Sequence, residues 1–172
     1  MAVNVTSADF SFGRFASRLE LKLKRFGVPA DKLCIEVTER VFLGVGSAHV
    51  ADALRRLRAM GVEIALDDFG TGYASLTHLK TFPIDRLKID RSFVQDMHEN
   101  KDSLSIAQAI VQLGHSLDLR VTAEGVENGE QLLLLQGMGC ASFQGFYFSK
   151  PLPAAEVQNF DTARSESQAE VA

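Results

Sequence analysis

Segments with the hydrophobic pattern of β-strands alternate along the chain with segments that have the hydrophobic pattern of α-helices. Short apolar runs fit strands of a parallel sheet, and between them apolar residues recur at helical spacing. The predicted strands cover residues 1–6, 33–39, 62–66, 85–90, 119–127 and 141–148. The predicted helices cover residues 14–26, 48–60, a segment that begins near 102, and 129–138. Ser47 and Asn128 are residue types that cap such helices.

A polar residue stands at or near the end of each predicted strand. These residues are Asn4, Glu36, Asp67, Lys88, Glu124 and Gln144. The strand–helix unit repeats at roughly the 30 residues of a βαβ unit. In a (β/α)₈ barrel the carboxyl ends of the strands converge on the face that carries the active site. A doubly wound sheet would gather ligands from fewer strands at one switch point. The pattern therefore favours an α/β fold of the TIM-barrel type.

Two adjacent carboxylates, Asp67 and Asp68, follow the most apolar predicted strand, and Gly70 and Gly72 come directly after them. Two carboxylates about 4 Å apart repel by about 1 kcal/mol in water and about 4 kcal/mol at an effective dielectric constant of 20. A bound hard cation such as Mg²⁺ or Mn²⁺ would offset this repulsion. The alternative is an exposed loop whose acids are simply solvated.

Composition narrows the class of protein. The 172 residues, 46% hydrophobic and 23% charged, suit one globular domain or a large part of one. A net charge of -4 gives no reason to expect binding to bulk nucleic acid. Cys34 and Cys140 lie in apolar surroundings and are expected to be buried thiols of a reduced compartment. With no long apolar run and no signal peptide, we expect a cytoplasmic protein without a membrane segment.

Several segments resemble the successive motifs of the EAL domain family, which comprises bacterial cyclic-di-GMP phosphodiesterases. In chain order they are Asn4, Ile35–Glu39, Asp67–Leu76, Leu87–Asp90, Ala123–Glu127 and Gln144–Pro151. The resemblance runs from about Val3 to Pro153, and the order of several motifs makes it specific. It implies an incomplete domain over residues 1–160, with about six of eight barrel strands. The polar composition of residues 161–172 separately predicts a disordered tail.

The resemblance also implies a two-metal hydrolysis of cyclic-di-GMP to linear pGpG, with Mg²⁺ or Mn²⁺ as cofactor. The family's metal ligands correspond to Asn4, Glu36 and Asp67 at one ion and to Asp68 at the second. Gln144 corresponds to a residue that orders metal-bound water. Hard oxygen ligands and ions that polarise a phosphate are consistent with this chemistry.

Three further positions carry catalytic roles by resemblance. Glu124 is similar to the general base or water ligand. Lys88 is similar to the residue that orients the attacking water or stabilises the developing charge, with Asp90 beside it. Two other interpretations stay open: Lys88 as a Schiff-base lysine of the aldolase kind, and Asp90 and Glu127 as rim residues in salt bridges. Glu39 is similar to the acid that anchors the Asp67–Tyr73 loop, which in the family links metal binding to homodimer formation.

The chain also departs from the family pattern. The Glu-Ala-Leu segment that names the family would lie upstream of Asn4, and the arginine that contacts the substrate phosphate is expected upstream of Met1. A (β/α)₈ barrel typically needs about 250 residues, so we expect about 80 residues and two strands to be missing. GGDEF or sensory domains upstream are possible partners in the family. Two hypotheses follow: the larger part of a working phosphodiesterase, or an inactive module that binds nucleotide or protein.

Overall fold

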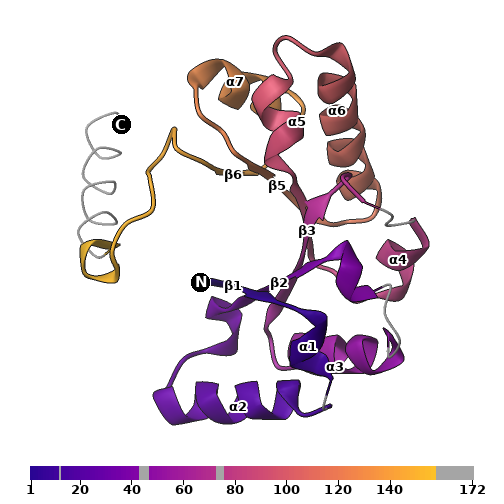
Figure 1. Cartoon of the computed structure of the whole chain (residues 1–172), viewed down its shortest axis with the longest axis vertical. Coiled ribbons are helices and arrows are strands. Elements are labelled where there is room, and N and C mark those ends of the chain that lie inside the picture. Colours follow the sequence, from indigo (N-terminus) through magenta and orange to yellow (C-terminus); the bar gives the residue numbers. More distant parts are fainter. Residues whose placement is uncertain (12, 43–46, 73–75, 158–172) are drawn as a thin grey trace.

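The computed structural model describes residues 1–11, 13–42, 47–72 and 76–157. Within them, six strands form one sheet in which every neighbouring pair is parallel and the spatial order follows the chain. The strands are β1 (Ala2–Val5), β2 (Cys34–Thr38), β3 (Glu63–Phe69), β4 (Arg86–Ile89), β5 (Arg120–Glu124) and β6 (Ser142–Gln144). The helices pack around one side of this curved sheet, which gives half of a (β/α) barrel (Figure 1).

The helices connect successive strands. Those of eight or more residues are α2 (Phe15–Phe26), α3 (Ser47–Ala59), α6 (Lys101–Ser116) and α7 (Gly129–Gly137). The shorter ones are α1 (Ser7–Phe10), α4 (Leu76–Thr81), α5 (Arg91–Asp96) and two 3₁₀ turns, η1 (Ala30–Lys32) and η2 (Glu39–Phe42). The predicted capping box at Asn128 is confirmed, because its side chain accepts from the backbone of Gln131. α3 begins at Ser47, and the predicted cap there depends on residues outside the described part of the chain.

The hydrophobic core lies between the sheet and these helices. Alternate residues of each strand face it, such as Ile64 and Leu66 on β3 and Leu87 on β4, all fully buried. Leu54 and Leu57 of α3 belong to the same cluster. Because successive side chains of a strand point to opposite faces, the remaining residues of each strand face the barrel interior. This alternation decides which residues can build a site.

A β-bulge interrupts the pairing of β3 with β4. Leu66 pairs with Leu87 and Phe69 with Ile89, so two residues, Asp67 and Asp68, lie opposite one. Asp68 has a φ of 54°, the left-handed region that Asp tolerates better than most residues. The prediction that β3 ends before the two acids was therefore wrong. The strand continues to Phe69, and the extra residue re-aims the side chains, as bulges beside active sites commonly do.

Two other predicted strands are shorter than expected. β5 ends at Glu124, because Gly125 takes a φ of 72° and leaves the ladder. β6 ends at Gln144 rather than running to Phe148. A Cβ at Gly145 would clash with the carbonyl oxygen of Val126, so the chain turns there in direct contact with another backbone segment. The helices α1, α4 and α5 were not predicted; they are too short to show a helical period. The predicted tail at 161–172 lies outside the described residues.

β1 and β6 are the edge strands of the sheet, and among the described residues each pairs with one neighbour. Edge strands expose unpaired backbone groups that can pair with another chain. We expect the 172-residue chain to form concentration-dependent oligomers, detected by light scattering. Val3→Lys on β1 should reduce association, because charge on an edge strand disfavours pairing. Leu21→Lys, at an exposed position on α2, is the matched control. A monomer at all concentrations would contradict this expectation.

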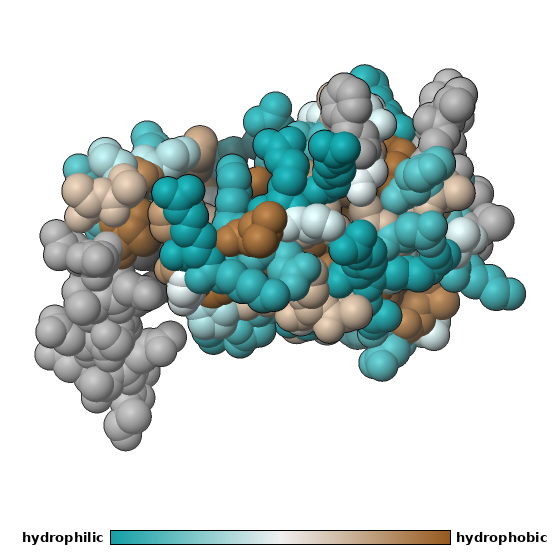
Figure 2. All heavy atoms as spheres, turned by 90° about the horizontal axis from the view of Figure 1, so that it is seen from below, coloured by the Kyte–Doolittle hydropathy of each residue, from teal (hydrophilic) through white to brown (hydrophobic). Residues whose placement is uncertain are grey.

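One face of the molecule carries few exposed hydrophobic residues. Figure 2 shows a face that is largely hydrophilic, with hydrophobic residues scattered among charged ones. Exposed hydrophobic residues on α2 include Leu21 and Phe26. Among the described residues, no helix is both long and apolar enough to span a membrane.

Candidate active site

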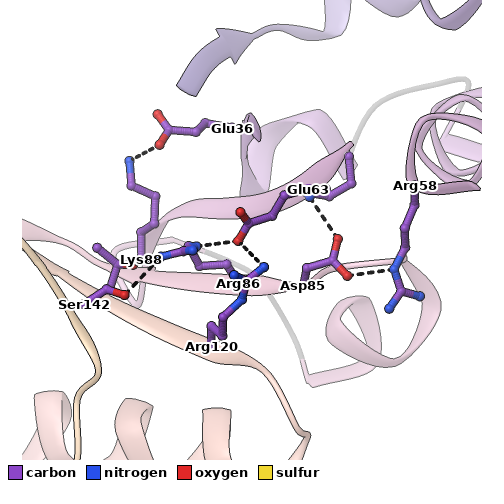
Figure 3. Close-up of polar contacts among 10 residues, drawn as sticks. Glu36, Arg58, Glu63, Asp85, Arg86, Lys88, Arg120 and Ser142 are labelled. Carbon is purple, nitrogen blue, oxygen red and sulfur yellow. Dashed lines mark hydrogen bonds and ion pairs between the residues drawn. The ribbon is translucent and has the colours of Figure 1, made fainter. Parts of the chain in front are cut away.

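Three carboxylates surround one lysine at the carboxyl ends of the strands. The Nζ atom of Lys88, on β4, lies 2.8 Å from Glu36 on β2, 2.9 Å from Asp67 on β3 and 2.6 Å from Glu124 on β5. Lys88 is 4% exposed, and Glu36 and Asp67 are also buried. Each residue faces the barrel interior near the carboxyl end of its strand. Figure 3 shows Lys88 reaching across the interior toward Glu36. The structure thus brings together four of the predicted residues.

A cluster of oxygen atoms beside Lys88 fits a divalent cation. One carboxylate oxygen from each of Asp67, Asp68 and Glu124 lies within 4.8 Å of the others. The Oδ1 atom of Asp67 is buried, and its contact among the described residues is the ion pair with Lys88 at 2.9 Å. Carboxylate oxygens are the ligands that Mg²⁺ and Mn²⁺ prefer, so these residues fit the group.

Electrostatics in the cluster favour a charged lysine. Burial alone would lower the pKa of Lys88, but its contacts with Glu124, Glu36 and Asp67 outweigh burial and raise the pKa above its ordinary value. A Schiff-base lysine needs a lowered pKa, so this environment disfavours the aldolase interpretation. Burial raises the pKa of Glu124, and the charges of Asp67 and Glu36 add to this rise despite the contact with Lys88.

Asp68 and Asp90 form a second acidic pair next to this cluster. Burial and the neighbouring carboxylates Asp67 and Asp90 raise the pKa of Asp68. Burial would also raise the pKa of Asp90, but hydrogen bonds from Ser92 outweigh it and lower the pKa. Asp90 accepts from the Ser92 backbone N–H at 2.9 Å and caps α5. The Asp90 side chain thus stabilises the first turn of α5.

The raised pKa of Glu124 makes the stability of the chain depend on pH. In the folded state Glu124 holds its proton to higher pH than in the unfolded state. Its contribution to stability is therefore fully present below the unfolded pKa of about 4.3 and is lost as pH rises through the folded pKa. We expect Glu124→Gln to flatten the fall in unfolding temperature above that pH in chelator. Glu127→Gln, at an exposed position, should leave the slope unchanged, and equal slopes for both would contradict this origin.

Glu39 lies where a loop anchor is expected. It opens η2, is buried, and accepts a hydrogen bond at 3.4 Å from the backbone N–H of Gly70. A Cβ at Gly72 would clash with Glu39 Oε2, so the glycine is needed for this close approach. Glu39 thus contacts the segment that follows the bulge. Tyr73, the end of the predicted loop, lies outside the described residues.

The remaining predicted residues lie at the margins of the site. Asn4 on β1 pairs in register with Glu36, and Gln144 on β6 with Glu124, but both side chains are exposed on the edge strands. The predicted rim salt bridges are not present among the described residues: Asp90 caps α5, and Glu127 accepts a hydrogen bond from Gln95. Cys140 is buried as expected, whereas Cys34 is only half-buried; both are free thiols.

Met1 lies at the opposite end of β1 from the acidic cluster. The family resemblance predicts that the arginine in contact with the substrate phosphate lies upstream of Met1. Met1 itself is exposed, and its amino group donates a hydrogen bond to the carbonyl oxygen of Lys32 at 2.7 Å. Met1 therefore joins β1 to the segment before β2 and is not a residue of the site. The group that binds the substrate phosphate stays a prediction.

A second polar layer beneath the site was not predicted. Arg86 of β4 contacts Glu63 of β3 at 2.6 Å, and Thr122 and Ser142 at 2.7 and 3.3 Å (Figure 3). Arg120 of β5 pairs with the same Glu63 oxygen at 2.8 Å. These residues precede the site residues by two or four positions on their strands, so the period of two could have identified them. The layer links β3 to β6 directly below the acidic site.

The sequence matches one family over most of its length. The sequence model of the EAL domain matches residues 1–151. The cyclic di-GMP phosphodiesterase NbdA of Pseudomonas aeruginosa is 39% identical over 160 residues, which are 93% of this chain and 20% of that protein. The chain spans about a fifth of the length of the curated relatives it matches.

Solved structures match the fold closely. The MucR phosphodiesterase in complex with c-di-GMP, from P. aeruginosa, has a TM-score of 0.84 at 40% identity, covering 91% of this chain and 63% of that one. A manganese and cyclic-di-GMP complex of BlrP1 from Klebsiella pneumoniae has a TM-score of 0.79 at 34% identity, covering 87% and 38%. With a family match over most of its length and the same half-barrel, the chain belongs to the EAL domain family.

Proposed function

We propose that this chain carries the catalytic centre of a cyclic-di-GMP phosphodiesterase, which hydrolyses one phosphodiester bond to give linear pGpG. The observation that carries the proposal is the cluster of Glu36, Asp67 and Glu124 around the buried Lys88, with oxygens of Asp67, Asp68 and Glu124 close enough together to hold a cation. The cluster lies at the carboxyl ends of the strands, the end at which barrels of this type act. Relatives named as cyclic-di-GMP phosphodiesterases support the choice of substrate.

The cofactor in this proposal is Mg²⁺ or Mn²⁺. Asn4, Glu36 and Asp67 would hold one ion, and Asp68 would help to hold a second, while Gln144 would order water at the margin. When bound, such ions polarise phosphoryl oxygens and lower the pKa of bound water. The acidic oxygens of Asp67, Asp68 and Glu124 and the manganese complex of BlrP1 support this assignment.

The protein's own groups provide the proton transfer and charge. Glu124 accepts a proton from the attacking water; its raised pKa brings it nearer to neutrality, where a general base is most effective. Lys88, held charged by its carboxylate partners, lies where it stabilises the negative charge that develops on the phosphate. Asp90, which caps α5, fixes the segment that follows Lys88 and lies next to Asp68.

Regulation through a dimer is part of the same proposal. Glu39 contacts Gly70 directly after the bulge that carries Asp67 and Asp68. A change in the segment 67–73 would therefore act on the metal-binding carboxylates, and a homodimer contact through this segment would couple association to metal binding. The long relatives support additional domains upstream, of the GGDEF or sensory kind, and a cytoplasmic location fits this signalling chemistry.

A chimera tests the function. Residues 1–151 would replace the matching segment of the MucR phosphodiesterase, whose structure overlaps 91% of this chain. The chimera should convert cyclic-di-GMP to pGpG only with Mg²⁺ or Mn²⁺. A folded chimera that binds the nucleotide without turnover would refute catalysis and support the alternative of a binding module. Turnover in excess chelator would refute the metal-dependent mechanism.

A further inference from the structure

We propose that Lys88 is an internal counter-ion that competes with a divalent cation for the acidic cluster and so sets how tightly the site binds metal. This inference rests on the metal site of the proposed function, but it concerns affinity rather than turnover. Lys88 is the cation of the cluster in the present structure, with three carboxylates from three strands within 2.9 Å of its Nζ atom. No other lysine or arginine of the described residues makes an ion pair with these carboxylates.

The contacts of Lys88 overlap the candidate metal ligands. Asp67 and Glu124 contribute oxygens both to the Lys88 ion pairs and to the group that could hold a metal. Each negative charge that Lys88 already neutralises attracts an arriving cation less strongly, and the ammonium repels that cation at short range. The free energy of metal binding is therefore smaller than the three carboxylates would provide without Lys88.

The same contacts explain why the cluster is stable without metal. Three neighbouring carboxylates, two of them buried, would repel one another strongly without a counter-charge. Removing one partner of a buried ion pair is typically very destabilising. Lys88 offsets this repulsion, so the strands β2, β3 and β5 can hold the site in place before any ion binds. Lys88 thus stabilises the metal-free arrangement of the site and at the same time lowers its affinity for a metal ion.

Neutral variants of Lys88 distinguish its role as a counter-ion from a role in packing alone. Lys88→Gln keeps a hydrogen-bond donor for the carboxylates, and Lys88→Met keeps a similar length without one. In chelator we expect both to unfold at lower temperature, by on the order of 10 °C for Lys88→Met. Saturating Mn²⁺ should recover most of that loss and raise the unfolding temperature of the variants more than that of the parent chain.

Affinity gives the second readout. Titration of Mn²⁺, with free ion measured by electron paramagnetic resonance and no nucleotide present, should show at least about tenfold tighter binding by Lys88→Gln than by the parent chain. Lys24→Gln is the matched control, since it removes a lysine from an exposed ion pair with Glu20. Its affinity and its Mn²⁺-induced stabilisation should equal those of the parent.

The outcomes distinguish this inference from the proposed function. If the parent binds Mn²⁺ and the Lys88 variants bind it no more tightly, the counter-ion role is refuted while the metal site stands. If neither parent nor variants bind Mn²⁺, the metal site itself is refuted, and this inference with it. Variants that fold only with Mn²⁺ support the inference. Variants that fold neither with nor without Mn²⁺ overturn it, since a metal then cannot replace the lysine.

Discussion

Asp67→Asn is expected to reduce cyclic-di-GMP hydrolysis by the MucR chimera more than about 100-fold. Loss of a group that only orients a metal ligand typically costs about 10–100-fold, and Asp67 is a proposed ligand itself. Asp67 is buried and contributes both to the Lys88 cluster and to the candidate metal ligands. Replacing one oxygen by an amide removes the charge that a divalent ion requires. The measurement is steady-state turnover over a range of Mg²⁺ concentrations.

The fold should survive this change. Asn has nearly the same shape, and Lys88 keeps Glu36 and Glu124 as partners. Asp52→Asn, in an exposed ion pair with Arg55, is the control and should change neither turnover nor metal dependence. Replacing Mg²⁺ by Ca²⁺ should stop turnover of the unmodified site, because Ca²⁺ accepts irregular coordination. Full activity of Asp67→Asn at low Mg²⁺ would remove Asp67 from the metal ligands.

Glu124→Gln is expected to lower the rate of the chemical step by about 10²–10⁴-fold, the usual contribution of a general base. Glu124 lies 2.6 Å from Lys88 at the end of β5, and its raised pKa favours proton transfer near neutral pH. An amide of the same shape cannot accept that proton. Nucleotide binding should persist, because the change leaves Glu36 and Asp67 in place. Single-turnover assays of the chimera measure the step directly.

Glu127→Gln provides the comparison for this prediction. Glu127 lies on the same segment, is exposed and contacts Gln95 rather than the cluster, so its loss should leave the rate within about twofold. A fall of less than about fivefold for Glu124→Gln would place that residue in a structural role instead of a catalytic one. A loss of nucleotide binding in Glu124→Gln would point to the same correction.

Much of the fold could be predicted because the signals are periodic. Strands buried on one side by helices appear as apolar runs, and α2, α3 and α6 are long enough to show helical spacing. The polar residue at each strand end predicted the location of the site, since parallel strands carry their carboxyl ends to one face. The meeting of Glu36, Lys88 and Glu124 follows from that rule.

The details that could not be predicted depend on contacts between segments distant in sequence. The bulge at Asp67 and Asp68 exists only relative to the partner strand β4, whose register no local pattern reveals. The end of β6 depends on the approach of Gly145 to Val126. Asn128 illustrates the opposite case, because a capping box needs only its own four residues and was predicted correctly.

The order of the strands in the sheet has a consequence for biosynthesis. Each strand from β2 to β6 pairs with the strand that precedes it in the chain. As the chain leaves the ribosome from its amino terminus, every new strand therefore meets an edge that is already formed, and none must wait for a later one. Lys88 emerges after Glu36 and Asp67, so two of its carboxylate partners are present when it arrives. Glu124 then closes the cluster from β5, which makes the proposed general base the last of the four to be installed during translation.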